Sequence, residues 1–173
     1  MPADSQKPSV HRIRPADPAD RDALCALVAA AGVFSDEEVA CAQDIIDEAL
    51  AEPGPQNYQI LVAELPESGT LVGYACYSRT PFTRAASDLY WLATHPQHRR
   101  GGAARRLIAA METELRRQGI IHVRVETSGT GGYSAARSFY ESLGYENIAR
   151  IPDFYKPDDA LYTYYKRLPE AAV

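Results

Sequence analysis

Apolar positions along the chain follow the spacing of helices in some stretches and the alternation of strands in others. Two helix starts are marked: Asp17 stands before Pro18, and Ser35 with Glu38 three residues later forms a capping box. Short apolar runs between turn residues predict strands. The strands expected from these runs cover about residues 12–14, 58–64, 70–77, 88–94, 121–127, 145–150 and 160–167.

Helices are expected between these strands. The helix after Asp17 should end at Gly32, and the helix after Ser35 should end at Pro53-Gly54-Pro55. Two further helices follow the fourth and fifth strands and should close at Gly119 and Gly144. Strand pairs towards both ends of the chain, with helices between them, indicate an α+β fold with a mixed sheet.

We expect a single domain over residues 1–173, because the chain shows no internal repeat and no linker that would divide it. The polar residues 1–10 form an expected flexible lead-in. The second and third strands should make a hairpin. The last two strands should flank a loop that contains Pro152, Pro157, Asp158 and Asp159.

The segment between the fourth strand and the third helix carries the clearest chemical signal. It reads His95-Pro96-Gln97-His98-Arg99-Arg100-Gly101-Gly102-Ala103-Ala104-Arg105-Arg106-Leu107. A strand, a turn with paired glycines and then a helix leave backbone N–H groups unpaired at the positive end of a helix dipole, which favours an anion such as phosphate. We call residues 99–104 the anion turn. An ordinary turn with solvated arginines is the alternative.

Charge favours a small polyanion over a nucleic acid. The formal net charge is −5 and the pI about 5.4, while arginines gather around the anion turn. The three cysteines and four histidines show no metal-ligand spacing, so no metal is expected. No apolar run reaches the ~20 residues that span a bilayer, and the first residues contain no apolar signal core. We therefore expect no membrane partner and a cytoplasmic location.

Two motifs resemble those of one enzyme family. The anion turn and His98 before it resemble motif A of the GCN5-related N-acetyltransferases (GNATs), Gln/Arg-x-x-Gly-x-Gly/Ala, with a histidine at the first position. Residues 136–145, Ala-Arg-Ser-Phe-Tyr-Glu-Ser-Leu-Gly-Tyr, resemble motif B, Ala-x-x-Phe/Leu-Tyr-Glu-x-x-Gly-Phe. The motifs stand in family order around the fifth strand, and the resemblance covers about residues 13–168.

The resemblance implies a mostly antiparallel sheet of six to seven strands flanked by helices, with the fourth and fifth strands splayed apart. It also implies acetyl-CoA as co-substrate, with its pyrophosphate on main-chain N–H groups and its pantetheine arm on the edge of the fourth strand. Family members often carry an asparagine seven residues before the motif B tyrosine, where this chain has Tyr133. The implied cofactor-binding residues are Leu92, Ala93, Thr94, Arg99, Arg100, Gly101, Gly102, Ala103, Ala104, Tyr133 and Tyr140.

Two residues are candidates for catalysis. The resemblance places Tyr140 beside the coenzyme sulfur, where a phenol that stays protonated at neutral pH can donate to a departing thiolate. By spacing alone, Tyr140 could equally be a core aromatic. Glu126 is the candidate base, because several family members carry a glutamate near the end of the fifth strand that deprotonates the amine. Asp88 and water compete for this role, and either carboxylate could instead pair with a nearby arginine.

The expected function is an acetyl-CoA-dependent N-acetyltransferase that moves an acetyl group to a primary amine of a small molecule by direct attack. A non-catalytic coenzyme A-binding sensor or interaction module is the alternative. Tyr140 favours the enzyme, whereas the departures from the family pattern at His98 and Tyr133 favour the alternative. The chain has no Gly-x-x-x-x-Gly-Lys-Ser/Thr, which excludes a P-loop hydrolase. Four aromatic residues in or near loops could line the acceptor pocket: Phe34, Phe82, Tyr133 and Tyr155. Tyrosine clusters could equally form a homodimer face or fill the core.

Overall fold

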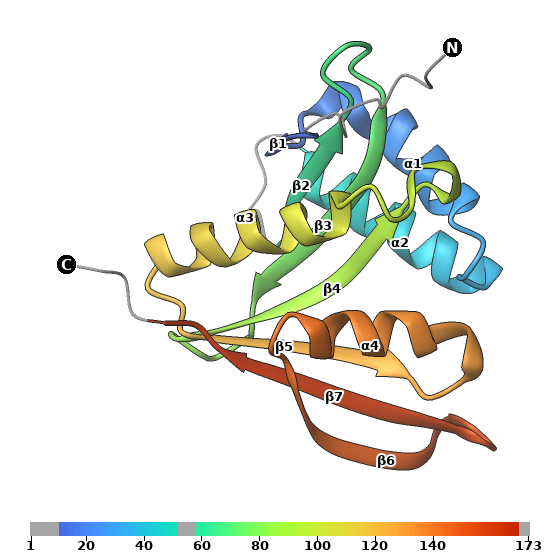
Figure 1. Ribbon diagram of the computed structural model, residues 1–173, viewed down its shortest axis with the longest axis vertical. Coiled ribbons are helices and arrows are strands. Elements are labelled where there is room, and N and C mark those ends of the chain that lie inside the picture. Colours follow the sequence, from blue (N-terminus) through green and yellow to red (C-terminus); the bar gives the residue numbers. More distant parts are fainter. Residues whose placement is uncertain (1–10, 52–57, 170–173) are drawn as a thin grey trace, which may run out of the picture.

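The computed structural model describes residues 11–51 and 58–169, which build one seven-stranded sheet in the order β1-β2-β3-β4-β5-β7-β6 (Figure 1). Its strands are β1 (Arg12–Pro15), β2 (Gln59–Glu64), β3 (Leu71–Arg79), β4 (Ala86–Thr94), β5 (His122–Ser128), β6 (Glu146–Lys156) and β7 (Asp159–Arg167). Only β4 and β5 pair in parallel within this sheet. The predicted mixed, mostly antiparallel sheet is therefore confirmed.

Helices occupy the connections. The α-helices in the described ranges are α1 (Arg21–Ala30), α2 (Asp36–Leu50), α3 (Ala103–Arg117) and α4 (Ser134–Ser142). Short 3₁₀ turns precede three of the four: η1 (Pro18–Asp20), η2 (Pro96–His98) and η3 (Gly131–Tyr133).

The sheet separates two apolar cores because side chains alternate along its strands. In β2, Leu61 and Ala63 pack in the core shared with α3 and α4, whereas Ile60 and Val62 pack in the core shared with α1 and α2. Figure 1 shows α3 lying across β2 and β3 and α4 running along β5. The buried stripe of α3 consists of Ala103, Leu107, Ile108, Met111 and Leu115.

Strands β4 and β5 pair only over their first halves. The parallel register ends at Leu89 opposite Val125, and beyond it β4 pairs with β3 and β5 with β7 among the described residues. The separation begins at a β-bulge in β4, where the pairing with β3 skips Tyr90. A bulge bends its strand and increases the local twist, which turns β4 away from β5. The predicted splay between the fourth and fifth strands is present.

Both predicted helix starts are present in the structure. The Ser35 hydroxyl accepts from Glu38 N–H at 3.2 Å, and Ser35 N–H donates to the Glu38 carboxylate at 2.7 Å, which completes the capping box. Asp17 also caps with its side chain, but it caps η1, and α1 begins three residues after Pro18. A 3₁₀ turn that begins at Pro18 thus precedes α1.

Two expectations concern residues outside the described ranges: the flexible lead-in over residues 1–10 and the helix stop at Pro53-Gly54-Pro55. Within the described part of the chain, α2 ends at Leu50. No helix in that part is long and apolar enough to cross a membrane.

The last hairpin corrects the prediction of a loop around Pro152. Strand β6 instead continues to Lys156, and only Pro157 and Asp158 turn the chain into β7. Strand β6 lies at the sheet edge, is exposed along its whole length, and has an irregular register with β7 after Ile151. An edge strand tolerates proline at a bulge because no ladder hydrogen bond is lost there. The loop prediction failed because it treated this proline as a strand end.

Candidate active site

The anion turn is held by backbone hydrogen bonds on both sides. His95 N–H donates to Val72 O at 2.9 Å, which fixes the end of β4 against β3, and His98 N–H closes η2 onto His95 O at 2.9 Å. Helix α3 starts its own hydrogen bonds with Arg106 N–H to Gly102 O at 3.1 Å. The N–H groups of the first turn of α3 have no carbonyl one turn earlier, so they are available to an anion.

The two glycines of the turn are required for different reasons. Gly102 has a φ of +83°, in the left-handed region, and a Cβ there would meet nothing within 4 Å. A Cβ on Gly101 would instead lie 3.2 Å from Cε1 of His11 and 3.3 Å from the carbonyl oxygen of His98. Gly101 therefore permits close packing, and Gly102 permits the backbone conformation that starts α3.

Two arginines of this region tie it to neighbouring helices. The Arg99 guanidinium donates to Ala31 O at the end of α1, and Arg105 Nη2 donates to the Ser142 hydroxyl at the end of α4 at 3.2 Å. Arg100 is exposed and has a φ of +64°. Arg99 and Arg100 stay predicted phosphate contacts, and the structure gives Arg99 a further role in fixing the turn against α1.

The second half of β4 leads directly into the anion turn. Leu92, Ala93 and Thr94 lie beyond the bulge, where the described part of the sheet gives β4 a strand partner only in β3. Among the described residues, the backbone edge that faces β5 therefore has no strand partner here. An extended ligand can add to such an edge as a strand would. The fold thus places the predicted contacts at 92–94 and 99–104 in one continuous run.

Tyr140 lies in α4, packed among other tyrosines. The ring centroids of Tyr145 and Tyr164 are 5.9 and 6.0 Å from its own. These two neighbours donate their hydroxyls to Glu112 at 3.0 Å and to Glu141 at 2.9 Å, whereas no described residue hydrogen-bonds the Tyr140 hydroxyl. Burial raises the pKa of Tyr140, so the phenol stays protonated. Its hydroxyl is thus a donor without an internal acceptor.

Three charged residues meet where β4 and β5 separate. Arg124 Nε donates to Asp88 Oδ1 at 2.7 Å, and Arg124 Nη1 lies 3.5 Å from Glu126 Oε1. The Asp88 side chain is 9% exposed and the Glu126 side chain 42%. Asp88 is therefore the buried partner of Arg124, and Glu126 is the carboxylate that a substrate can reach. With Leu89 and Tyr90, the three line a cavity of about 100 Å³.

Two tyrosines face acidic groups near the open end of β5. The Tyr133 hydroxyl donates to Glu38 Oε1 at 2.9 Å, so Tyr133 connects η3 to α2, and its coenzyme contact stays a prediction. Burial and then Glu38 raise the pKa of Tyr133. Burial and then the charge of Glu126 raise the pKa of Tyr155. Glu38 also contributes to the raised pKa of Tyr155, so both carboxylates are within electrostatic reach of that phenol.

Three residues of this region escaped the sequence-based prediction. Sequence reasoning assigns Glu38 only to a capping box, and its contact with Tyr133 depends on tertiary structure. Arg124 stands two positions before Glu126 and on the same side of β5, a spacing that could have signalled the pair. No sequence pattern places His11 beside the glycine turn, because the two are 90 residues apart.

His11 should make stability depend on pH. Burial, then Arg106 and then His98 lower the pKa of His11 from its ordinary value of 6.5. The folded state therefore binds fewer protons at this site than the unfolded state, and stability falls as the pH drops below about 6.5. In urea denaturation we expect His11→Leu to lose less unfolding free energy than wild type between about pH 7 and about pH 5. Equal losses would contradict the prediction.

Comparisons with known proteins agree with this geometry. Residues 56–147 match the family model of the acetyltransferase (GNAT) domain. A GNAT-family protein of known structure from Desulfovibrio desulfuricans is 32% identical over 92% of this chain and all of its own, with a TM-score of 0.86. No curated protein matches the chain.

More distant structures share the fold. The ribosomal-protein-S18-alanine N-acetyltransferase of Escherichia coli is 19% identical, with a TM-score of 0.72 over 94% of this chain and 97% of its own. A Salmonella typhimurium protein solved with its cofactor acetyl-CoA is 22% identical, with a TM-score of 0.69 over 95% of this chain and 98% of its own.

Proposed function

The chain belongs to the GNAT family of acetyltransferases, and on this premise we propose that it transfers the acetyl group of acetyl-CoA to a primary amine of a small molecule. One observation carries the proposal: the second half of β4 does not pair with β5, and the anion turn follows directly after it. A diphosphate on the turn leaves room for an extended arm along Leu92–Thr94. The arm then leads towards the point where β4 and β5 part.

The turn suits the coenzyme in three respects. Its N–H groups can each donate to a phosphate oxygen, and such bonds to an anion are stronger than those to a neutral acceptor. The glycines allow the backbone to approach closely. Arg100 and Arg105 add positive charge at the start of α3. These contacts hold the coenzyme without touching its acetyl group.

The transfer follows from the groups at the splay. Glu126 takes a proton from the ammonium form of the acceptor, directly or through water, and the free amine attacks the thioester carbonyl carbon. A C–N bond forms and the C–S bond breaks, so the electron pair of that bond leaves on the coenzyme sulfur. The attacking nitrogen loses its second proton to solvent as the amide forms, and the Tyr140 hydroxyl donates its proton to the thiolate. Solvent then returns a proton to the Tyr140 phenolate and takes one from the Glu126 carboxylic acid. Burial of the phenol suits this role because it keeps the donor protonated.

The charge around the open end of β5 supports a cationic acceptor. Glu126 is half exposed there, and Glu126 and Glu38 both act electrostatically on Tyr155. A protonated amine is attracted by these carboxylates and can also lie over the face of an aromatic ring such as Tyr155. A carboxylate-rich acceptor would be repelled by the same groups. We therefore propose an amine that reaches the enzyme as a cation.

The direct test is release of free thiol from acetyl-CoA in the presence of a panel of amines. The panel should contain polyamines and aminated sugars, amino acids, and N-acetylated forms of the same compounds as matched controls. We expect thiol release with cationic amines and none with their N-acetylated forms. A chain that binds coenzyme A but releases no thiol with any amine would support the non-catalytic coenzyme A module instead.

Glu126→Gln should lower activity in a manner that high pH partly relieves. A neutral amide cannot accept the proton, but a larger fraction of the acceptor is already deprotonated as the pH rises towards the amine pKa. We expect the ratio of wild-type to variant kcat/KM to shrink between about pH 7 and about pH 9.5. The measurement is a pH profile of thiol release with one amine.

Asp88→Asn is the matched control for this experiment. The Asp88 carboxylate is buried and accepts from Arg124, so Asp88→Asn should lower the thermal stability because it removes the negative charge that faces the guanidinium. Its activity loss should not shrink at high pH. If Asp88→Asn shows the pH relief and Glu126→Gln does not, the base is Asp88.

A further inference from the structure

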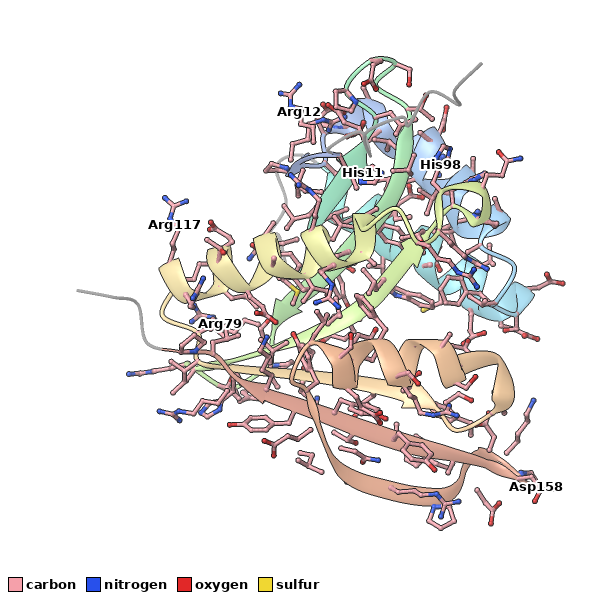
Figure 2. All side chains as sticks on the ribbon, in the orientation of Figure 1. His11, Arg12, Arg79, His98, Arg117 and Asp158 are labelled. Atoms are coloured by element: carbon pink, nitrogen blue, oxygen red, sulfur yellow. The ribbon has the colours of Figure 1, made fainter. Side chains whose placement is uncertain are left out.

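His11 packs directly against the anion turn from the start of β1. Its side chain is buried, with Cε1 3.2 Å and Nε2 3.6 Å from the position that a Cβ on Gly101 would take. The contact joins the first residue of the described chain to a turn 90 residues later. Figure 2 shows His11 near the start of α3, with His98 on the neighbouring segment. The imidazole thus supports the glycine turn on the side where the Gly101 Cβ is missing.

The imidazole packs at this position in spite of a free-energy cost. Its Nδ1 is buried and has no hydrogen-bond partner among the described residues, which costs free energy that an apolar side chain of similar size would avoid. The charged groups that face it are Arg106 from α3 and His98 from η2, and both disfavour a charged imidazole. The ring therefore stands neutral beneath a turn that is surrounded by positive charge.

We propose that His11 is a positioning residue for coenzyme binding, which sets the position of the Gly101 backbone and with it the direction of the N–H groups of the anion turn. This inference rests on the proposed function, because it takes the coenzyme diphosphate as the ligand of the turn. His11 acts through Gly101 and not on the reacting acetyl group. Its loss should therefore raise the KM for acetyl-CoA and leave kcat unchanged.

A double-mutant cycle tests this pairing. Calorimetry would measure the binding of coenzyme A to wild type, His11→Ala, Gly101→Ala and the double variant. We expect each single substitution to weaken coenzyme A binding about tenfold. His11→Ala leaves an empty space under the turn, and Gly101→Ala presses a Cβ against the imidazole. The dissociation constant of the double variant should rise by less than the product of the two single-variant increases. The reason is that the new Cβ enters the space that the imidazole leaves.

His122→Ala is the matched control. It also removes a partly buried imidazole, one that lies on β5 and is 2.9 Å from the Tyr165 hydroxyl, and it should leave coenzyme affinity unchanged. Should His11→Ala not fold, His11→Asn takes its place in the cycle. Additive losses, or a loss in kcat alone, would overturn the role of His11. A wild-type chain that does not bind coenzyme A would overturn the proposed function itself, which distinguishes the two failures.

Discussion

Tyr140→Phe should lower kcat by about 10²–10⁴-fold while the dissociation constant for acetyl-CoA changes by less than about threefold. In the proposed mechanism the hydroxyl donates to the sulfur only as the C–S bond breaks, so its loss should affect the transition state and not the bound coenzyme. Raising the pH should not relieve the loss, because deprotonation of the amine does not replace the missing donor. Single-turnover thiol release and calorimetry measure the two quantities separately.

The neighbouring tyrosine supplies a control of the same chemistry. Tyr164 donates its hydroxyl to Glu141, so Tyr164→Phe breaks a hydrogen bond to a charged group and should cost about 1.5–3 kcal/mol of unfolding free energy. Tyr140→Phe breaks no described hydrogen bond and should leave stability nearly unchanged. Full activity of Tyr140→Phe on a good acceptor would assign Tyr140 to packing alone.

Much of the fold was predictable because its signals are local. The capping box at Ser35 and the glycine pair before α3 depend on residues within a few positions of each other, and both are present as predicted. Successive side chains of β2 likewise point alternately into the two cores on either side of the sheet. The splay between β4 and β5 came from the family resemblance, and its local cause, the bulge at Tyr90, left no recognisable sign in the sequence.

The features that escaped prediction depend on contacts between distant segments or on edge position. The contact of Glu38 with Tyr133 and that of His11 with Gly101 join parts of the chain that only the fold brings together. Pro152 was misread because a proline ends a central strand but not an exposed edge strand. The single-domain boundaries, the cytoplasmic location and the homodimer stay predictions, as do the roles of the named site residues.

Gly102→Val should abolish useful coenzyme binding without unfolding the protein. Valine is β-branched and strongly disfavours the φ of +83° that Gly102 adopts, so the residue before α3 must change conformation. The N–H groups that start the helix then point elsewhere. Loss of two hydrogen bonds to a charged ligand corresponds to about 3 kcal/mol or more, which is a weakening of roughly 100-fold. Calorimetry with coenzyme A measures it.

Gly119 offers a matched control at the other end of the same helix. It has a φ of +78° and, like Gly102, open space where a Cβ would be, so Gly119→Val imposes the same backbone strain away from the anion turn. Both variants should lose a similar unfolding free energy, of about 1–2 kcal/mol or somewhat more. Only Gly102→Val should lose coenzyme affinity. Equal affinity losses in the two variants would show that the strain acts through general destabilisation of α3, and the anion turn would lose its assignment as the diphosphate site.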